Sequence, residues 1–186
     1  NTKVLLKNLE NHFKEYEEQF ELLRWIDEAV GDDESSLERF FYEMYSRFKK
    51  TFNAKRIGMV SFSNNSWFPF KFDNEQINGN TLFILENLPE IPKEVKEGKV
   101  IITHHWQDSY ITLFIPLIFF ENVLFLVILQ DDLSTLESTR LNKDVVSFAE
   151  DITKRINVVM QYKENIRTGK VKDNLISAFF ENQLNP

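Results

Sequence analysis

The chain has 186 residues, of which 42% are hydrophobic and 27% are charged, so it carries enough apolar material for one compact domain with a sizeable core. Its formal charge of −7 argues against a dominant role in nucleic-acid binding, because phosphate recognition needs a clustered basic surface. The absence of cysteine excludes disulfides, thiolate metal sites and cysteine nucleophiles.

The first predicted helix carries apolar side chains alternately three and four residues apart. This spacing is typical of a coiled-coil seam, which is narrower than the apolar stripe of a helix packed on a globular core. The seam consists of Leu6, Leu9, Phe13, Tyr16, Phe20 and Leu23. Gly31 is placed to end this helix. We therefore expect residues 1–34 to form a coiled-coil-type helix that needs a partner helix.

A second helix is predicted to begin in the segment Ser35-Ser36-Leu37-Glu38, which has the pattern of a capping box. Turn residues and apolar stretches after it predict a hairpin, a short helix and a further strand. The expected ranges are 55–62 and 67–72 for the hairpin, 80–88 for the helix and 99–103 for the strand.

Two apolar runs, residues 110–120 and 123–129, are hydrophobic at both alternating phases, as expected for central strands covered on both faces. Asn142 can then cap a long last helix. Its own seam steps by four and three through Val145, Ala149, Ile152, Ile156 and Val159. The predicted fold is α/β in the α+β sense: a mostly antiparallel central sheet with helices on both faces and long terminal helices.

The strand Phe114-Ile115-Pro116-Leu117, followed by a short turn and the apolar strand 124–129, resembles the strand-turn-strand signature of the GAF domain family. The resemblance covers roughly residues 35–160, from the opening helix to the closing helix. It implies a sensory domain with a ligand pocket on the sheet face away from the terminal helices. Residues 161–186 would then be a C-terminal signalling helix that leads to an output domain.

This chain departs from several active branches of the family. The cysteines that attach bilins or reduce methionine sulfoxide are absent, and the spacing of Asn142-Lys143 and Phe148 differs from the motif of cyclic-nucleotide-binding members. The resemblance therefore implies no catalysis by this segment.

Four residues are the candidates for a small-molecule pocket: Phe70, Phe83, His105 and Trp106. Aromatic side chains and an imidazole suit a mostly apolar pocket, although core packing explains such an excess equally well. Adjacent histidines on a strand point to opposite faces, so we expect no metal site. The carboxylates Asp131 and Asp132 are expected in a solvated turn. No catalytic residue and no cofactor can be named.

The two ends of the chain carry opposite charge. Residues 1–38 hold eleven acidic and four basic side chains, a net charge of −7, whereas residues 154–172 have a net charge of +5. Complementary helices of this kind can pack side by side, and in a dimer they would set the orientation. We expect a parallel homodimer held by the first seam together with Ile152, Ile156 and Val159.

The end of the chain, Gln183-Leu184-Asn185-Pro186, resembles the approach to the phosphoacceptor of histidine kinases. With no initial Met, the chain is expected to be a piece of a longer protein. No signal peptide or bilayer-spanning run is found, so we expect a cytoplasmic protein without membrane contact.

Three hypotheses follow from the sequence. The first is a sensory or regulatory GAF-like domain that dimerises through its terminal helices and controls an output enzyme, such as a histidine kinase or a cyclase. The second is a ligand-free structural dimerisation module with a filled core. The third, a small-molecule enzyme, lacks a catalytic constellation.

Overall fold

The computed structural model describes residues 1–32, 34–88, 90–105, 109–119 and 123–168. The elements run in the order α1 (Thr2–Ala29), α2 (Leu37–Phe52), β1 (Arg56–Ser63), β2 (Ser66–Pro69), α3 (Glu75–Asn87), α4 (Lys93–Lys96), β3 (Ile101–His105), β4 (Tyr110–Phe119), β5 (Val123–Asp132), a 3-10 turn (Leu133–Thr135) and α5 (Lys143–Thr168). The predicted α+β fold is confirmed.

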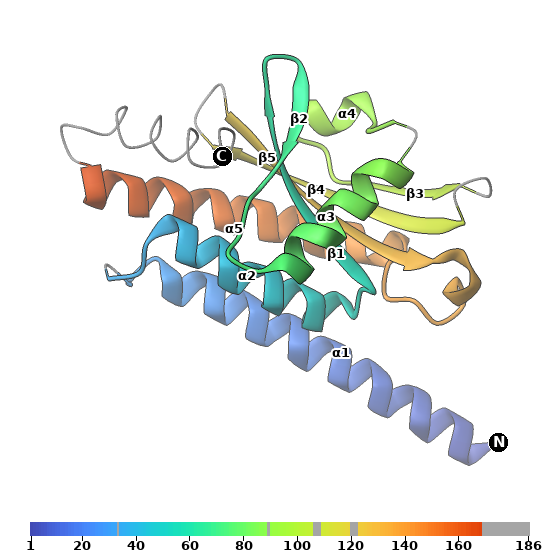
Figure 1. Ribbon diagram of the computed structural model, residues 1–186. Coiled ribbons are helices and arrows are strands. Elements are labelled where there is room, and N and C mark those ends of the chain that lie inside the picture. The colour runs from blue at the N-terminus through green and yellow to red at the C-terminus, as the bar shows by residue number, and fades with distance from the viewer. Residues whose placement is uncertain (33, 89, 106–108, 120–122, 169–186) are drawn as a thin grey trace.

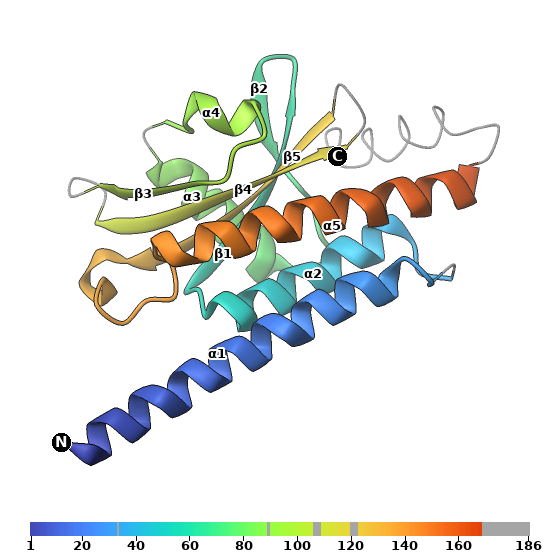
Figure 2. The same cartoon turned by 180° about the vertical axis from the view of Figure 1, so that it is seen from behind.

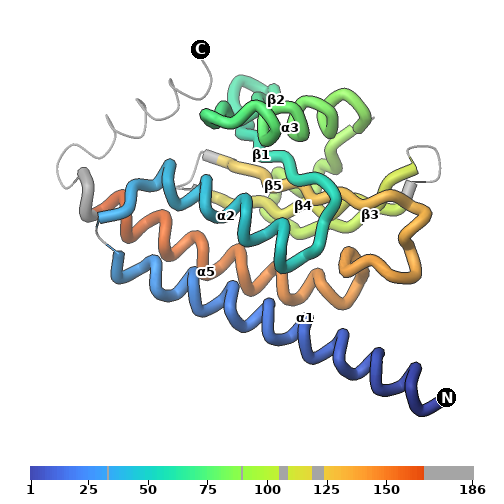
Figure 3. Tube along the Cα trace, turned by 60° about the horizontal axis from the view of Figure 1, so that its bottom comes forward, coloured from blue at the N-terminus to red at the C-terminus, as the bar shows by residue number. Residues whose placement is uncertain are grey.

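The strands form one antiparallel sheet in the order β2-β1-β5-β4-β3. Helices α2 and α5 cover one face of this sheet, and α3 and α4 lie on the other face (Figures 1 and 2). Helix α1 forms a further layer outside α2 and α5 (Figure 3). Helices therefore cover both faces, as the sequence predicted.

Central strand β5 explains why the apolar runs have no alternation. Phe125, Val127 and Leu129 pack into the core on the α2 and α5 side, whereas Leu126 and Ile128 pack on the side of α3. Both sets are at most 1% exposed. Since successive side chains of a strand point to opposite faces, a strand buried on both faces must be apolar throughout.

Helix boundaries follow local capping. The N-cap of α2 is Ser36, whose Oγ accepts from the Arg39 N–H at 3.1 Å, so the cap lies one residue after the predicted Ser35, and Arg39 takes the place that Glu38 would have in the predicted capping box. Asn142 caps the last helix as predicted, since its side chain accepts from the Asp144 N–H at 2.9 Å. Asn74 caps α3 in the same way, and this helix therefore begins five residues before the predicted start at residue 80.

Helix α1 consists of two parts with different surroundings. Its C-terminal part buries Leu22, Ile26 and Ala29 in the core formed with α2 and α5. In contrast, every residue from 1 to 14 is exposed, and this end of the helix extends beyond the rest of the molecule (Figure 3). The first half of the helix is therefore held by few contacts of its own chain.

Candidate functional site

The structure separates the residues predicted to form a ligand pocket. Phe70 is 1% exposed and packs against Phe41 and Phe125, with ring centroids 5.7 and 5.0 Å apart, in the core beneath the terminal helices. Phe83 lies on α3, on the opposite face of the sheet, and is 36% exposed. The placement of Phe70 on the face away from the terminal helices is therefore wrong.

The other two predicted pocket residues lie at the edge of the described part of the structure or beyond it. His105 is the last residue of β3 and pairs with Tyr110 of β4, while its side chain lies outside the described part of the structure. Trp106 also lies outside the described residues. A role of Phe83, His105 and Trp106 in ligand binding stays a prediction.

Side chains fill the space between α3 and the sheet. A second apolar cluster on this face consists of Val60, Ile84, Val95, Phe114, Leu126 and Ile128, each at most 1% exposed. Gly58 permits α3 to approach β1 closely, because a Cβ at this position would lie 3.3 Å from the Cα of Thr81. The middle of the face that the GAF resemblance assigns to a ligand is therefore occupied by protein.

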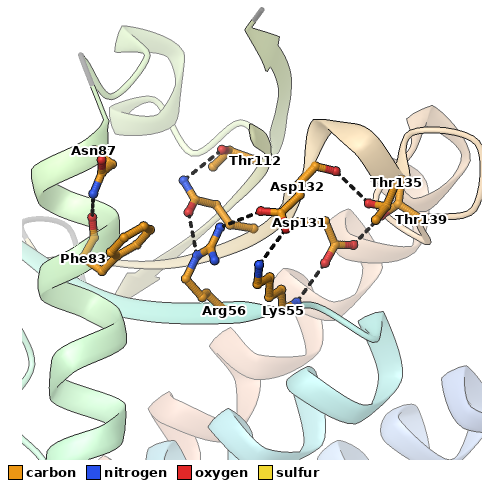
Figure 4. A network of polar contacts seen from close by, with 10 residues as sticks. Lys55, Arg56, Phe83, Asn87, Thr112, Asp131, Asp132, Thr135 and Thr139 are labelled. Atoms are coloured by element: carbon orange, nitrogen blue, oxygen red, sulfur yellow. Dashed lines mark hydrogen bonds and ion pairs between the residues drawn. The ribbon is translucent and has the colours of Figure 1, made fainter. Parts of the chain in front are cut away.

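A polar network surrounds Arg56 at one end of the sheet (Figure 4). The Arg56 side chain donates from Nε to Gln130 Oε1 and from Nη2 to Asp132 Oδ1, both at 3.3 Å. Its guanidinium carbon lies 4.7 Å from the ring centroid of Phe83 and 4.9 Å from that of Tyr110. Arg56 is 9% exposed, so the ion pair and the two rings together compensate for the cost of burying its charge.

The neighbouring carboxylates are both bound by donors. Asp131 is 7% exposed and accepts from the Lys55 N–H at 2.8 Å and from the Thr139 hydroxyl, so the expectation of a solvated turn is wrong for this residue. Asp132 accepts from Lys55 Nζ at 2.6 Å. This hydrogen bond, with a smaller contribution from Arg56, holds the pKa of Asp132 below its ordinary value. The network links β1 to β5, and both of its carboxylates already accept hydrogen bonds, so neither is a free general base.

The outer face of α1 carries the apolar seam predicted for a partner helix. Five of its members are exposed by more than half: Leu6 at 54%, Leu9 at 54%, Phe13 at 72%, Tyr16 at 68% and Phe20 at 66%. With Leu23, which is partly buried against the core, they span an arc of about 100° around the helix. The core-facing positions Leu22, Ile26 and Ala29 lie roughly 150° away from the centre of this arc. Helix α1 thus has two apolar faces, and one of them is uncovered.

The second predicted seam does not face outward. Ile152, Ile156 and Val159 of α5 are each 0% exposed and belong to the core between this helix and the sheet. Their assignment to a dimer interface is therefore wrong, because residues buried within one chain cannot contact a second copy. The spacing alone did not distinguish the two environments, since a helix packed on a sheet also presents apolar residues every three or four positions.

The opposite charges of the terminal helices are also used within one chain. Arg155 on α5 pairs with Asp27 on α1 at 2.5 Å, and this contact raises the pKa of the guanidinium above its ordinary value. Lys163 donates from Nζ to the carbonyl oxygens of Asp32 and Ser35, at 2.9 and 3.1 Å. The prediction that the acidic and basic helices pack side by side is confirmed, and the two helices belong to the same chain. Charged side chains that are paired within one chain contribute less to the orientation of a dimer.

A cleft of about 290 Å³ lies between α1, α2 and α5, lined by Trp25, Glu28, Ala29, Asp32, Ser35, Phe40, Glu43 and Lys163. The Trp25 indole in this cleft already has partners: its ring stacks on Phe40, with centroids 4.9 Å apart, and its Nε1–H donates to Glu43 Oε2 at 3.3 Å. Within the described ranges, no three His, Cys, Asp or Glu side chains are grouped so that they could hold a metal ion. This cleft therefore shows no feature that selects a ligand class.

No known protein-family model matches the chain, and a search of curated proteins finds no match. Among the described helices, none combines the length and the apolar character needed to cross a bilayer. The outer face of α1 is thus the feature that most needs a functional explanation. Sequence reasoning found this face from its spacing but missed the Arg56 network, whose members are far apart in the chain and carry no periodic signal.

Proposed function

We propose that this chain is a non-enzymatic regulatory module of the GAF type that pairs with a second copy through the outer face of α1. The pair of modules would pass a conformational signal through the terminal helices to an output domain of the same chain. The observation that carries this proposal is the exposed seam from Leu6 to Phe20.

The area of the seam supports a stable contact. Phe13, Tyr16 and Phe20 are about two-thirds exposed, so each leaves roughly 100–170 Å² of ring in water. The three rings together leave about 300–500 Å² uncovered, and Leu6 and Leu9, each 54% exposed, bring the face toward the ~800 Å² that each partner contributes to a standard interface. Uncovered apolar patches of this size on soluble proteins usually mark interaction sites.

Charge around the seam favours a second copy over an anionic membrane. Glu10, Glu17 and Glu21 flank the seam on one side, and acidic side chains disfavour a negatively charged lipid surface. With Leu6, Phe13 and Phe20 at the a positions of the heptad, Glu10 and Glu17 occupy e positions, and Leu5 and His12 occupy g positions. In a parallel pair, the e positions of one copy face the g positions of the other, so no two carboxylates meet. Antiparallel pairing sets e positions against e positions and brings acidic side chains together. Parallel pairing is therefore the arrangement we propose.

A ligand-free dimerisation module is the second candidate. The filled space between α3 and the sheet, where Ile84 and Phe114 are 0% and 1% exposed, supports it. The two functions differ in a simple measurement: a sensory module changes its α1 or α5 amide exchange when its ligand is added, whereas a structural module shows the same exchange with every small molecule tested.

The dimer is tested with the double substitution Phe13→Glu with Phe20→Glu. We expect sedimentation equilibrium to show a dimer for the unmodified chain and a folded monomer for the variant, because four carboxylates in the seam would have to be desolvated on pairing. The matched control is Leu82→Glu with Leu136→Glu, which places the same charge on exposed apolar residues away from α1, at 49% and 44% exposure. This control should stay dimeric.

Two results would refute the proposed dimer. One is a monomeric unmodified chain at high micromolar concentration. The other is a dimer that persists in the Phe13→Glu and Phe20→Glu variant while its circular dichroism remains native.

A further inference from the structure

The first half of α1 is separated from the rest of the molecule by a polar groove of about 540 Å³. Asn8, Asn11, His12, Lys14 and Glu15 form the wall on α1. The opposite wall consists of Asn53 after α2 and, before α5, of Glu137, Ser138, Thr139, Arg140 and Asn142. Because no apolar side chain lines this groove, hydrophobic burial does not hold the helix at this point.

One ion pair spans the end of the groove. Arg140 binds the Glu18 carboxylate through Nη1, and the same nitrogen donates to the Thr51 carbonyl oxygen at 2.9 Å. The side chains of Arg140 and Glu18 are 18% and 11% exposed, so this pair is better shielded than an ordinary surface pair. Among the described residues, no side chain of α1 before Glu18 makes a hydrogen bond or an ion pair outside the helix.

Arg140 is itself fixed by its neighbours in the chain. Leu141 is 0% exposed, and its N–H donates to Thr139 Oγ1 at 3.0 Å. The Thr139 hydroxyl in turn binds Asp131 at the end of β5. Arg140 therefore lies in a loop that is hydrogen-bonded to the end of β5, and from there its guanidinium reaches both α1 and the end of α2.

We propose that Arg140 is a positioning residue that sets the direction in which the first half of α1 leaves the domain, and so aligns the seam for pairing. The inference rests on the proposed dimer for its consequence, but the positioning itself is a property of the single chain. Without Arg140, the next fixed point of α1 is Leu22 in the core, and roughly 20 residues of helix, about 30 Å, are free to swing over the groove.

The test measures the direction of α1 in a monomer. Since the chain has no cysteine, Lys3→Cys on α1 and Lys143→Cys at the start of α5 can be spin-labelled selectively. The distance between the labels is measured by pulsed electron resonance in the Phe13→Glu and Phe20→Glu background, so that only intramolecular distances contribute. We expect a narrow distribution of label-to-label distances, and we expect Arg140→Gln to broaden this distribution and shift its mean.

Three variants separate positioning from general damage. Arg140→Lys keeps a cation that can reach Glu18 and should restore the narrow distribution. Glu18→Gln removes the other partner and should broaden it as Arg140→Gln does. Arg155→Gln breaks the pair with Asp27, where α1 is also held by buried side chains, and should leave the distribution narrow.

In the seam-intact chain, Arg140→Gln should raise the dimer Kd by about tenfold, because α1 then has to be ordered on pairing. A distribution of unchanged width in Arg140→Gln and Glu18→Gln, or a broad one already present with Arg140, would overturn the inference. A monomeric unmodified chain would refute the proposed dimer alone, since the label distances still decide whether Arg140 positions the helix.

Discussion

Replacing Ile156 by Ala tests the assignment of the α5 seam to the core of one chain. Ile156 is 0% exposed and lies in the cluster between α5 and the sheet. The change removes three carbon groups at ~0.8 kcal/mol each, about 2.4 kcal/mol of transfer free energy. The cavity left in a packed core adds to this loss, so we expect the free energy of unfolding to fall by about 3–4 kcal/mol.

The assay is urea denaturation followed by circular dichroism at two protein concentrations about a hundredfold apart. If Ile156 belongs to the core of one chain, the loss relative to the unmodified protein is the same at both concentrations. Phe13→Ala serves as the matched comparison, because this ring is 72% exposed in the single chain. Its effect should be small at the lower concentration and grow at the higher one, where dimers form.

Two outcomes would contradict the reasoning for Ile156. A loss below about 1 kcal/mol would mean that the site is not a packed core position. A loss that appears only at the higher concentration would place Ile156 in an interface between copies and restore the seam that the spacing predicted.

Two further predictions concern the sheet. The pKa of Asp132 is lowered in the folded state, mainly by the hydrogen bond from Lys55, so its charged form adds stability above the pKa of an unfolded Asp, ~3.9, and this is lost as the pH falls through the folded value. The free energy of unfolding of Asp132→Asn should therefore fall less steeply than that of the unmodified chain as the pH is lowered below about 4. Equal slopes for the two proteins would contradict this. Gly58→Val should lower the free energy of unfolding by about 1–3 kcal/mol in thermal melts, because a Cβ here meets Ile84 Cδ1 at 3.1 Å and Thr81 Cα at 3.3 Å; an unchanged melt would mean that α3 can move away from β1 at little cost.

The fold was predictable because its signals are local. Apolar runs at both phases identified β4 and β5, and the caps at Ser36 and Asn142 lie within one residue of their predicted positions. The start of α3 was missed because Asn74, a short polar side chain that also suits a turn, was not recognised as a cap. Capping depends on the backbone conformation of the residue, which composition does not reveal.

The candidate site was less predictable because it depends on which face each element presents. Alternation sets Phe70 opposite to Trp67 but does not say which face the terminal helices cover; the Phe70 N–H still donates to the Met59 carbonyl oxygen at 2.9 Å, and both side chains lie in the core on the α2 and α5 side. Similarly, Phe20 and Ile156 have the same spacing in sequence, yet one is 66% and the other 0% exposed. Only the packing of α5 on the sheet, a contact between distant parts of the chain, separates these two cases.

The two faces of α1 limit how a signal can pass through this protein. Leu22, Ile26 and Ala29 fix the second half of α1 to the core, and the Asp27–Arg155 pair joins it to α5 at the surface. Sliding α1 along α5 would require these buried side chains to leave their packed positions, and closely packed interiors resist such displacement. In the proposed dimer, α1 and α5 of each copy would therefore move as one body. The change that reaches the output would then be a rotation of one copy against the other about the α1 seam, which carries no buried ion pair and can repack at lower cost.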